Sequence, residues 1–435
     1  MIAATIGKRF LKAYNEKYGC SYDAKNFFIE KYYDLFYNHN KYMMQGGNSP
    51  LENPKISWDK MLTGKIPFET KERRKERFMK FIEKVSNSSA DASIAIGYPS
   101  LDLTATTSGQ ITNLNLPFNQ DDVYYSWIGS GLGLGVQGGL SILFDKDQLL
   151  LDTFEGWEIY RDYLNRTPKL RGNQINTWNG QWIAHRYNPR TFNEGDKTAS
   201  FNGFGNLKDG GIEVNTQSWT AIMIGVSRKY PDAQITGYVY NLGQTNITIG
   251  FIPFKLPQIK RPLDLYEKYF GTTQREQVEQ LFGTAFGFTK ACQMGSIGIN
   301  ALEPKGLREF IQNGKVPSYN DKDEEKKINF NTYQIWLLAM LNNEQLWDYA
   351  QKIAATLNKY ALSSEKGKTI KTNNVKTVLS AVNKKQFIDN LTTVVEDVSN
   401  KIDYLEIAKL INEMPSDNVP YFLTLIRFQF AAINN

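Results

Sequence analysis

Residue types that could do chemistry are few in this sequence and stand apart from one another. The 435 residues include two histidines, His39 and His185, and two cysteines, Cys20 and Cys292. None of the four falls in a spacing typical of metal ligands or of a nucleophile and its base. The sequence also lacks a G-x-S-x-G elbow and a Walker A loop. We therefore expect no catalytic residue, no metal and no cofactor.

A glycine-rich run at residues 129–139 comes nearest to a cofactor motif, since it contains the spacing G-x-G-x-x-G. A dinucleotide-binding loop needs a strand before it and a helix after it, whereas the letters that follow, LSILFD, are typical of a strand. We prefer a tight turn that lets the backbone approach a neighbouring segment or a nucleic acid. A nucleotide-dependent enzyme using this run is the alternative. The glycines concerned are Gly129, Gly131, Gly133, Gly135, Gly138 and Gly139.

Residues 163–193 combine five cations with tryptophans and contain no acid. Arginine can hold phosphates with two hydrogen bonds and tryptophan can stack on bases, which is the combination that nucleic-acid grooves use. A surface loop whose charges meet acids elsewhere explains the same pattern equally well. Two tryptophans would also suit a carbohydrate- or peptide-binding module. The candidate DNA-binding residues here are Arg166, Lys169, Arg171, Trp178, Trp182, Arg186 and Arg190.

A second candidate for DNA binding is the segment TTSGQITN at residues 106–113. Its glycine turn has little bulk, and its amide side chains could hydrogen-bond base edges in a groove. A hairpin turn whose glutamine caps neighbouring carbonyls is the other interpretation. The residues singled out are Ser108, Gly109, Gln110 and Asn113.

The spacing of apolar residues predicts helices at both ends of the chain and strands in the middle. Residues 10–18, 24–35 and 70–85 show helical periodicity, and their spaced aromatics are more typical of core packing than of base stacking. The cations of 70–85 interleave with acids, which favours a solvated surface. The segments SIAIG, GGLSILFD, WTAIMIGVSR, ITGYVYNL and TNITIGFIPF are typical of strands. Helical patterns return at 149–164 and 263–311.

These elements predict an α+β fold with a helical N-terminal hairpin, a β-rich mixed body and a C-terminal helical bundle. The polar, charged segment KVPSYNDKDEEKKINF is expected to be a linker between body and bundle. The expected parts are a body over 1–315 (helical in 1–90, β-rich in 91–255, helical in 256–315), a linker over 316–330 and a bundle over 331–435.

Composition is that of a folded protein, and no apolar segment approaches the ~20 residues of a membrane-spanning helix. We expect a soluble, cytoplasmic protein, and the sparse cysteines fit a reducing compartment. The net charge is +6. Residues 1–90 hold most of the excess, with 17 Lys and Arg against 10 Asp and Glu. This balance mildly suggests a polyanionic partner.

Several segments together resemble the large subunit of type I CRISPR Cascade complexes, in particular the type I-B branch named for a CXXC-CXXC signature. They are TIGKRFL, NFFIEKYYDLFYNHNKYMM, ASIAIGYPS with TTSGQITN, and above all SWIGSGLGLGVQGGLSILFD. The resemblance runs through residues 1 to about 250. Neither Cys20 nor Cys292 has a CxxC partner, so the zinc site of the namesake signature is not carried over.

The resemblance implies a non-catalytic subunit that binds crRNA and the other Cascade subunits. Such a subunit reads the protospacer-adjacent motif on double-stranded target DNA, assists R-loop formation, and presents a surface to a recruited nuclease-helicase, while the guide reads the sequence. The C-terminal helices would correspond to a small-subunit-like bundle that lines the groove for the target or displaced strand. Lysines suited to that groove are Lys366, Lys368, Lys371 and Lys376.

Overall fold

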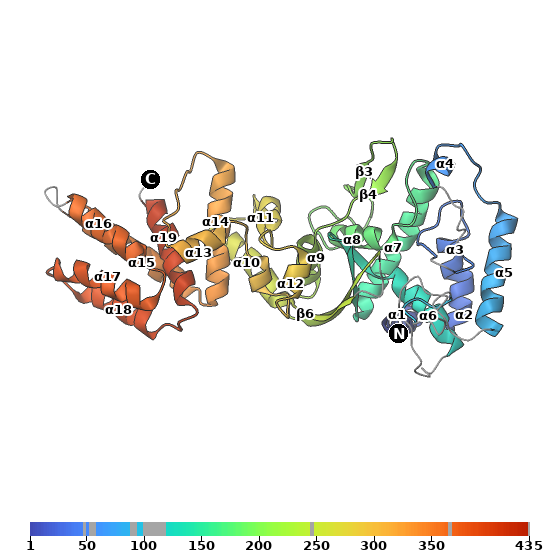
Figure 1. The fold of residues 1–435 in the computed structure, drawn as a ribbon, viewed down its shortest axis with the longest axis horizontal. Helices are drawn as coiled ribbons and strands as arrows, with labels where there is room; N and C mark the ends of the chain where they lie inside the picture. Colours follow the sequence, from blue (N-terminus) through green and yellow to red (C-terminus); the bar gives the residue numbers. More distant parts are fainter. Residues whose placement is uncertain are drawn as a thin grey trace. The chain divides into compact units, whose positions relative to one another are not determined.

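The computed structural model describes residues 1–46, 49–51, 58–87, 94–98, 119–243, 248–363 and 368–433. The chain forms two compact units, Met1–Phe254 and Lys255–Asn435. The first has helices at its start and a sheet in its later part, and the second is built from helices (Figure 1). The α+β fold class is therefore confirmed. The boundary lies near the end of the β-rich region, about sixty residues before the expected linker, because the helices after residue 255 pack with those of the C-terminus.

The N-terminal unit begins with the expected helical hairpin. Gly19 ends α1 with a left-handed φ of 61°, and the Asp23 carboxylate caps the next helix by accepting the Asn26 N–H. Phe10, Tyr14 and Phe27 are buried against one another, which confirms core packing for these aromatics. The helices of this unit are α1 Ile2–Tyr18, α2 Ala24–Phe27, the π-helical turn η1 Phe28–Tyr32, α3 Tyr33–Phe36, α4 Trp58–Leu62, α5 Lys71–Asn87, α6 Gln120–Gly131, α7 Asp147–Arg166, α8 Ile175–Arg186 and α9 Trp219–Lys229.

A four-stranded sheet with the order β1-β2-β5-β6 completes the unit. β1 pairs antiparallel with β2, and β2 pairs antiparallel with β5, which places Ile142 opposite Val239. β3 and β4 form a separate antiparallel pair. The strands are β1 Leu134–Val136, β2 Leu140–Phe144, β3 Phe204–Asn206, β4 Ile212–Val214, β5 Gln234–Asn241 and β6 Thr248–Lys255.

Two expected strands are wrong. The segment WTAIMIGVSR forms α9, whose first turn is capped by the Ser218 hydroxyl accepting the Ala221 N–H. α9 is buried on most sides, and a short apolar run gives no period that distinguishes a buried helix from a strand. Within SIAIG, the described residues 94–97 form turns. Ser126 accepts the Ile96 N–H there, and the Ile94 carbonyl accepts the Trp127 indole, in place of a strand partner.

Buried cations hold helix ends together in the N-terminal unit. Arg161 in α7 donates from Nε to the Leu35 carbonyl near the end of α3, and from a terminal nitrogen to the Lys41 carbonyl. Lys41 in turn donates to the Leu164 and Thr167 carbonyls at the end of α7. Cations at helix C-termini complement the helix dipole. Burial and the mutual proximity of these cations lower the pKa of Lys41 to about 8, and burial lowers the pKa of Arg161 to about 9.

His39 lies beside this cluster, and we expect its titration to contribute to the pH dependence of stability. Burial, and then the nearby Arg161, lower its pKa from 6.5 to about 4, with Asp34 opposing and Arg74 assisting the shift. A depressed histidine pKa means that its contribution is fully present above pH 6.5 and is lost as the pH falls toward 4. We expect the free energy of unfolding to fall more steeply over this range in the wild type than in His39→Gln. Urea unfolding at pH 7 and pH 4.5 measures the free energy of unfolding of both proteins. An equal decrease in the wild type and in His39→Gln would contradict the expectation.

The C-terminal unit is a set of packed helices in which α14 and α15 both contact α19 (Figure 1). The expected linker is partly wrong, because residues 324–330 form the first turns of α14, where Ile328 and Phe330 are buried and Asp323 caps the helix. The elements are α10 Leu256–Phe270, α11 Arg275–Leu281, α12 Phe288–Cys292, the 3-10 turn η2 Ile299–Leu302, α13 Leu307–Asn313, α14 Glu324–Leu341, α15 Gln345–Ala361, α16 Lys368–Leu379, α17 Lys384–Glu396, α18 Ile402–Glu413 and α19 Val419–Ile433.

Candidate functional site

The candidate DNA-binding stretch 163–193 runs from the end of α7 through α8 and a following turn. Both of its candidate tryptophans lie on α8 and are fully buried, with 0% of each residue exposed. The Trp178 indole donates to the Gly156 carbonyl and the Trp182 indole to the Asp152 carbonyl, both in α7. The rings are therefore core residues that join α8 to α7. Their predicted stacking role is wrong, and the same burial removes the support for a carbohydrate- or peptide-binding module.

The cations of this stretch lie nearer to acids than its own sequence indicates. Arg166 pairs with Asp162 one turn earlier in α7, and Arg171 pairs with Asp209 at 2.6 Å. The Asp209 pKa is lowered by a hydrogen bond from the Gly211 N–H and by Arg171. Lys169 and Arg190 are exposed on the surface. Four of the five cations thus remain at the surface, and the acids partly neutralise Arg166 and Arg171 among them.

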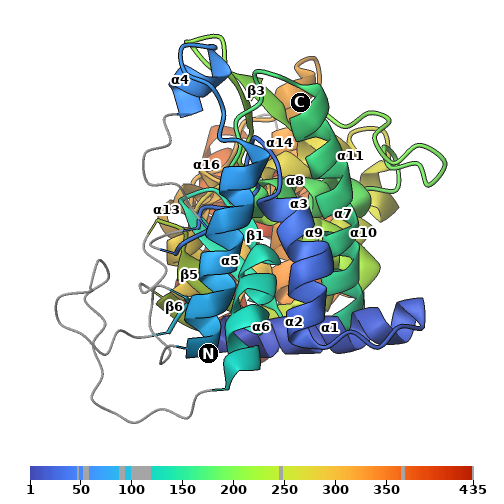
Figure 2. The same cartoon turned by 90° about the vertical axis from the view of Figure 1, so that its right-hand side faces the viewer.

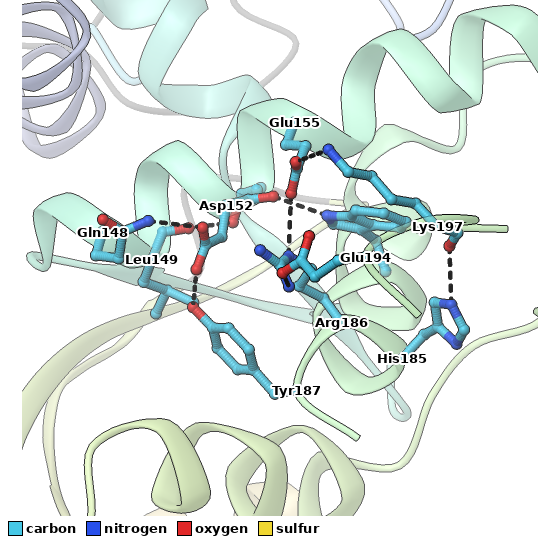
Figure 3. Close-up of polar contacts among 11 residues, drawn as sticks. Gln148, Leu149, Asp152, Glu155, His185, Arg186, Tyr187, Glu194 and Lys197 are labelled. Atoms are coloured by element: carbon cyan, nitrogen blue, oxygen red, sulfur yellow. Dashed lines mark hydrogen bonds and ion pairs between the residues drawn. The ribbon is translucent and has the colours of Figure 1, made fainter. Parts of the chain in front are cut away.

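Arg186 belongs instead to a network that fastens the turn after α8 to α7. Its guanidinium is 18% exposed and contacts Glu155 at 3.0 Å and Glu194 at 2.7 Å. Lys197 also binds Glu155, and its carbonyl lies 3.0 Å from Nε2 of His185 (Figure 3). The positive charges of Arg186 and Lys197 balance the negative charges of the two glutamates. Arg186 is therefore an internal partner of this network and is not available as a surface contact for phosphate.

Asp152 is the most buried carboxylate beside this network. One of its oxygens accepts the Gln148 amide and the other accepts the Tyr187 hydroxyl, both at 2.7 Å (Figure 3). Burial, followed by the nearby Asp152 charge, raises the pKa of Tyr187, so the phenol stays protonated and donates. Because a donor binds each oxygen, this carboxylate joins α7 to the end of α8.

The glycine-rich run lies where helices and strands approach one another closely. A Cβ at Gly129 in α6 would lie 1.8 Å from the Ala3 carbonyl oxygen of α1, and one at Gly135 in β1 would lie 2.8 Å from the Asn176 backbone in α8. Gly138 and Gly139 have φ of 95° and 72° and turn β1 into β2. Gly129 and Gly135 thus lie against neighbouring backbone, whereas a Cβ at Gly138 or Gly139 would meet nothing within 4 Å.

An amide side chain completes the packing around the run. Asn179 is fully buried and donates to the Gly131 carbonyl at 2.7 Å and to the Gly133 carbonyl at 2.9 Å. The element after the run is a strand and the element before it is a helix, which is the reverse of a dinucleotide-binding loop. The glycines therefore serve the contacts of α6 and β1 with their neighbours.

The remaining sequence candidates fall in other places. Ser108, Gly109, Gln110 and Asn113 lie outside the described residues. Within the described part of the chain, no group of three or more His, Cys, Asp or Glu side chains could hold a metal ion, and no helix is long and apolar enough to span a membrane. Burial raises the pKa of the Cys292 thiol to about 12, which makes it unreactive at neutral pH.

A groove of about 760 Å³ runs along the exposed side of α1. Its lining includes Lys8, Arg9 and Lys12 together with Glu16 and Asp147. Arg9 is bound by Asp145 at 2.7 Å and by Asp147 at 2.5 Å, so its charge is compensated. The mixture of signs gives this groove no strong preference for an anionic or a cationic ligand.

Comparison with known proteins gives no relative from which a function could be carried over. Neither family models, nor curated proteins, nor solved structures match the chain.

Proposed function

We propose that the chain is the non-catalytic large subunit of a crRNA-guided type I CRISPR surveillance complex. In this role it binds crRNA and the other Cascade subunits, recognises the protospacer-adjacent motif on double-stranded target DNA, and assists R-loop formation. It then recruits a nuclease-helicase. The partners are nucleic acids and proteins of the cytoplasm, and no cofactor is required.

The observation that carries the proposal is the structural role of the glycine-rich run. This run is the most specific part of the resemblance to the Cascade large subunit. Gly129 and Gly135 lie where any side chain would collide with backbone of α1 and α8. Packing therefore explains these glycines without a bound nucleotide, which leaves the alternative of a nucleotide-dependent enzyme without support.

Two further features agree with the proposal. Arg166, Lys169, Arg171 and Arg190 keep cationic groups at the surface of the N-terminal unit, as a subunit that contacts phosphates needs. The C-terminal unit is helical, as is the small-subunit-like bundle of the Cascade large subunits. Each feature also occurs in other protein classes, so they add to the resemblance and do not replace it.

Co-purification tests the proposal directly. We expect the tagged full chain, isolated from cells that carry a CRISPR array, to retain a short RNA that joins a repeat-derived constant part to variable spacers. Sequencing of the bound RNA measures this, with an unrelated tagged protein of similar net charge as the control. Enrichment of RNA no greater than in the control would overturn the proposal. Metal-dependent cleavage of DNA or RNA by the purified chain would contradict the non-catalytic assignment.

A further inference from the structure

Helix α5 carries more cations than acids and packs along one side against other helices of the N-terminal unit. Its 17 residues hold seven Lys and Arg against three Glu. One side packs on the helices that follow α1, where Phe81 stacks on Phe28 at 5.4 Å and Phe78 on Tyr33 at 3.8 Å between ring centroids. The other sides of α5 face outward from the N-terminal unit (Figures 1 and 2). The packing therefore presents its charges in a fixed orientation.

The charges of α5 are separated by sign around the helix. A rotation of about 100° per residue places Arg73, Arg77, Lys80 and Lys84 within a narrow strip along one flank, which we name the α5 basic face. Glu72, Glu76 and Glu83 lie on the outermost side, next to that flank. The strip extends ~16 Å along the axis, from Arg73 to Lys84.

Two cations of the α5 basic face keep their charge available. Arg77 is held by Glu69, with Nε 2.6 Å from the carboxylate, and this contact fixes the middle of the strip. Arg73 and Lys80 are exposed, and among the described residues neither forms an ion pair. The groove along α1 differs in this respect, because Arg9 there is already bound by two aspartates. An anionic ligand would therefore meet less competition on α5.

We infer that the α5 basic face binds the phosphodiester backbone of a nucleic acid. A strip of ~16 Å matches about five phosphates of one strand at ~3.4 Å each. Its side chains are all Lys and Arg, which position phosphates and read no base sequence. The inference rests on the proposed function, since it assumes that the chain binds nucleic acid. It gives a binding role to a helix surface for which the sequence alone favours simple exposure to solvent.

The test is a pair of charge reversals on the same helix. Arg73→Glu with Lys80→Glu changes the α5 basic face, whereas Lys71→Glu with Lys75→Glu changes the net charge equally on the other side of α5. The full chain is titrated with a labelled single-stranded RNA and with a DNA duplex of the same sequence at several salt concentrations. We expect the first variant to lose affinity at least tenfold and its log–log salt slope to fall by about 1.5, since each lost phosphate contact removes ~0.7 to ~0.9. The control should retain most of its affinity.

The outcomes separate the two proposals. Loss with RNA alone assigns the face to the guide, and loss with the duplex alone assigns it to the target DNA. If the wild type binds and the basic-face variant binds equally well, or if both variants lose affinity alike, the α5 assignment is wrong while the proposed function stands. If the wild type binds neither probe, both fail. Arg73→Gln with Lys80→Gln, which keeps polar side chains on the helix, should give a smaller loss in the same direction and guards against misfolding.

Discussion

Gly129→Ala is expected to lower the melting temperature of the N-terminal unit by about 10 °C, which corresponds to about 3 kcal/mol. The added methyl carbon would lie 1.8 Å from the Ala3 carbonyl oxygen and 2.8 Å from the Gly7 amide nitrogen. These are backbone atoms of α1, so the clash cannot be relieved by a side-chain rotation. Helices α1 and α6 must separate, which opens their shared contact.

A second helical glycine supplies the control. Gly225 in α9 is also surrounded by other residues, but a Cβ there would meet its nearest neighbour, the Tyr187 Cβ, at 3.4 Å, an ordinary van der Waals distance. Gly225→Ala should therefore leave the melting temperature unchanged or raise it slightly, because alanine favours a helix by ~1 kcal/mol over glycine. Differential scanning calorimetry of both variants measures the contrast. Equal melting temperatures for the two variants would contradict the close approach.

Arg427→Met is expected to destabilise the C-terminal unit by about 4 kcal/mol. The guanidinium is fully buried in α19 and donates to the Leu379, Ala381 and Phe310 carbonyls at 2.8–3.1 Å, as well as to the Thr424 hydroxyl. Methionine fills similar space but leaves three backbone carbonyls without donors, at ~1 to ~3 kcal/mol each. Burial lowers the pKa of the Arg427 guanidinium to about 10. Methionine removes this buried charge and its desolvation cost, which offsets part of the loss.

Two other substitutions bracket that result. Arg427→Lys keeps one donor group, and its free energy of unfolding should lie between those of the wild type and Arg427→Met, since a single ammonium cannot reach all of the carbonyls. Lys409→Met removes an exposed cation that lies 3.9 Å from Glu413 and should change the free energy of unfolding by less than ~0.5 kcal/mol. Urea unfolding measures all three. A loss for Arg427→Met no larger than for Lys409→Met would exclude a bridging role for this arginine.

The sequence predicts those parts of the fold that depend on local spacing. The four-residue recurrence of Phe10 and Tyr14 indicates α1, and Gly19 marks its end. The letters after Gly139 indicate a strand, and β2 lies there. The run WTAIMIGVSR lacks a decisive period, so its helix could not be distinguished from a strand.

The candidate site is less predictable because it depends on residues that are distant along the chain. Trp178 and Trp182 stand among cations in the sequence, yet the carbonyls that hold them lie in α7. The acid that neutralises Arg186 is Glu155, also in α7. The lack of acids within a stretch of sequence therefore does not predict the net charge that surrounds it in the folded unit. The α5 basic face could have been found by placing its charges on a helical wheel, since it depends on spacing alone.

The order of strands in the sheet has a consequence for synthesis on the ribosome. β2 is buried along its whole length, and its partner on one side is β5, with Leu140 opposite Asn241. On the order of a hundred residues separate these partners, so at ~5 to ~20 residues per second β2 leaves the ribosome ~5 to ~20 s before β5. During that interval an apolar strand has an unpaired edge. Nascent β2 is therefore a segment that a chaperone would protect until β5 emerges.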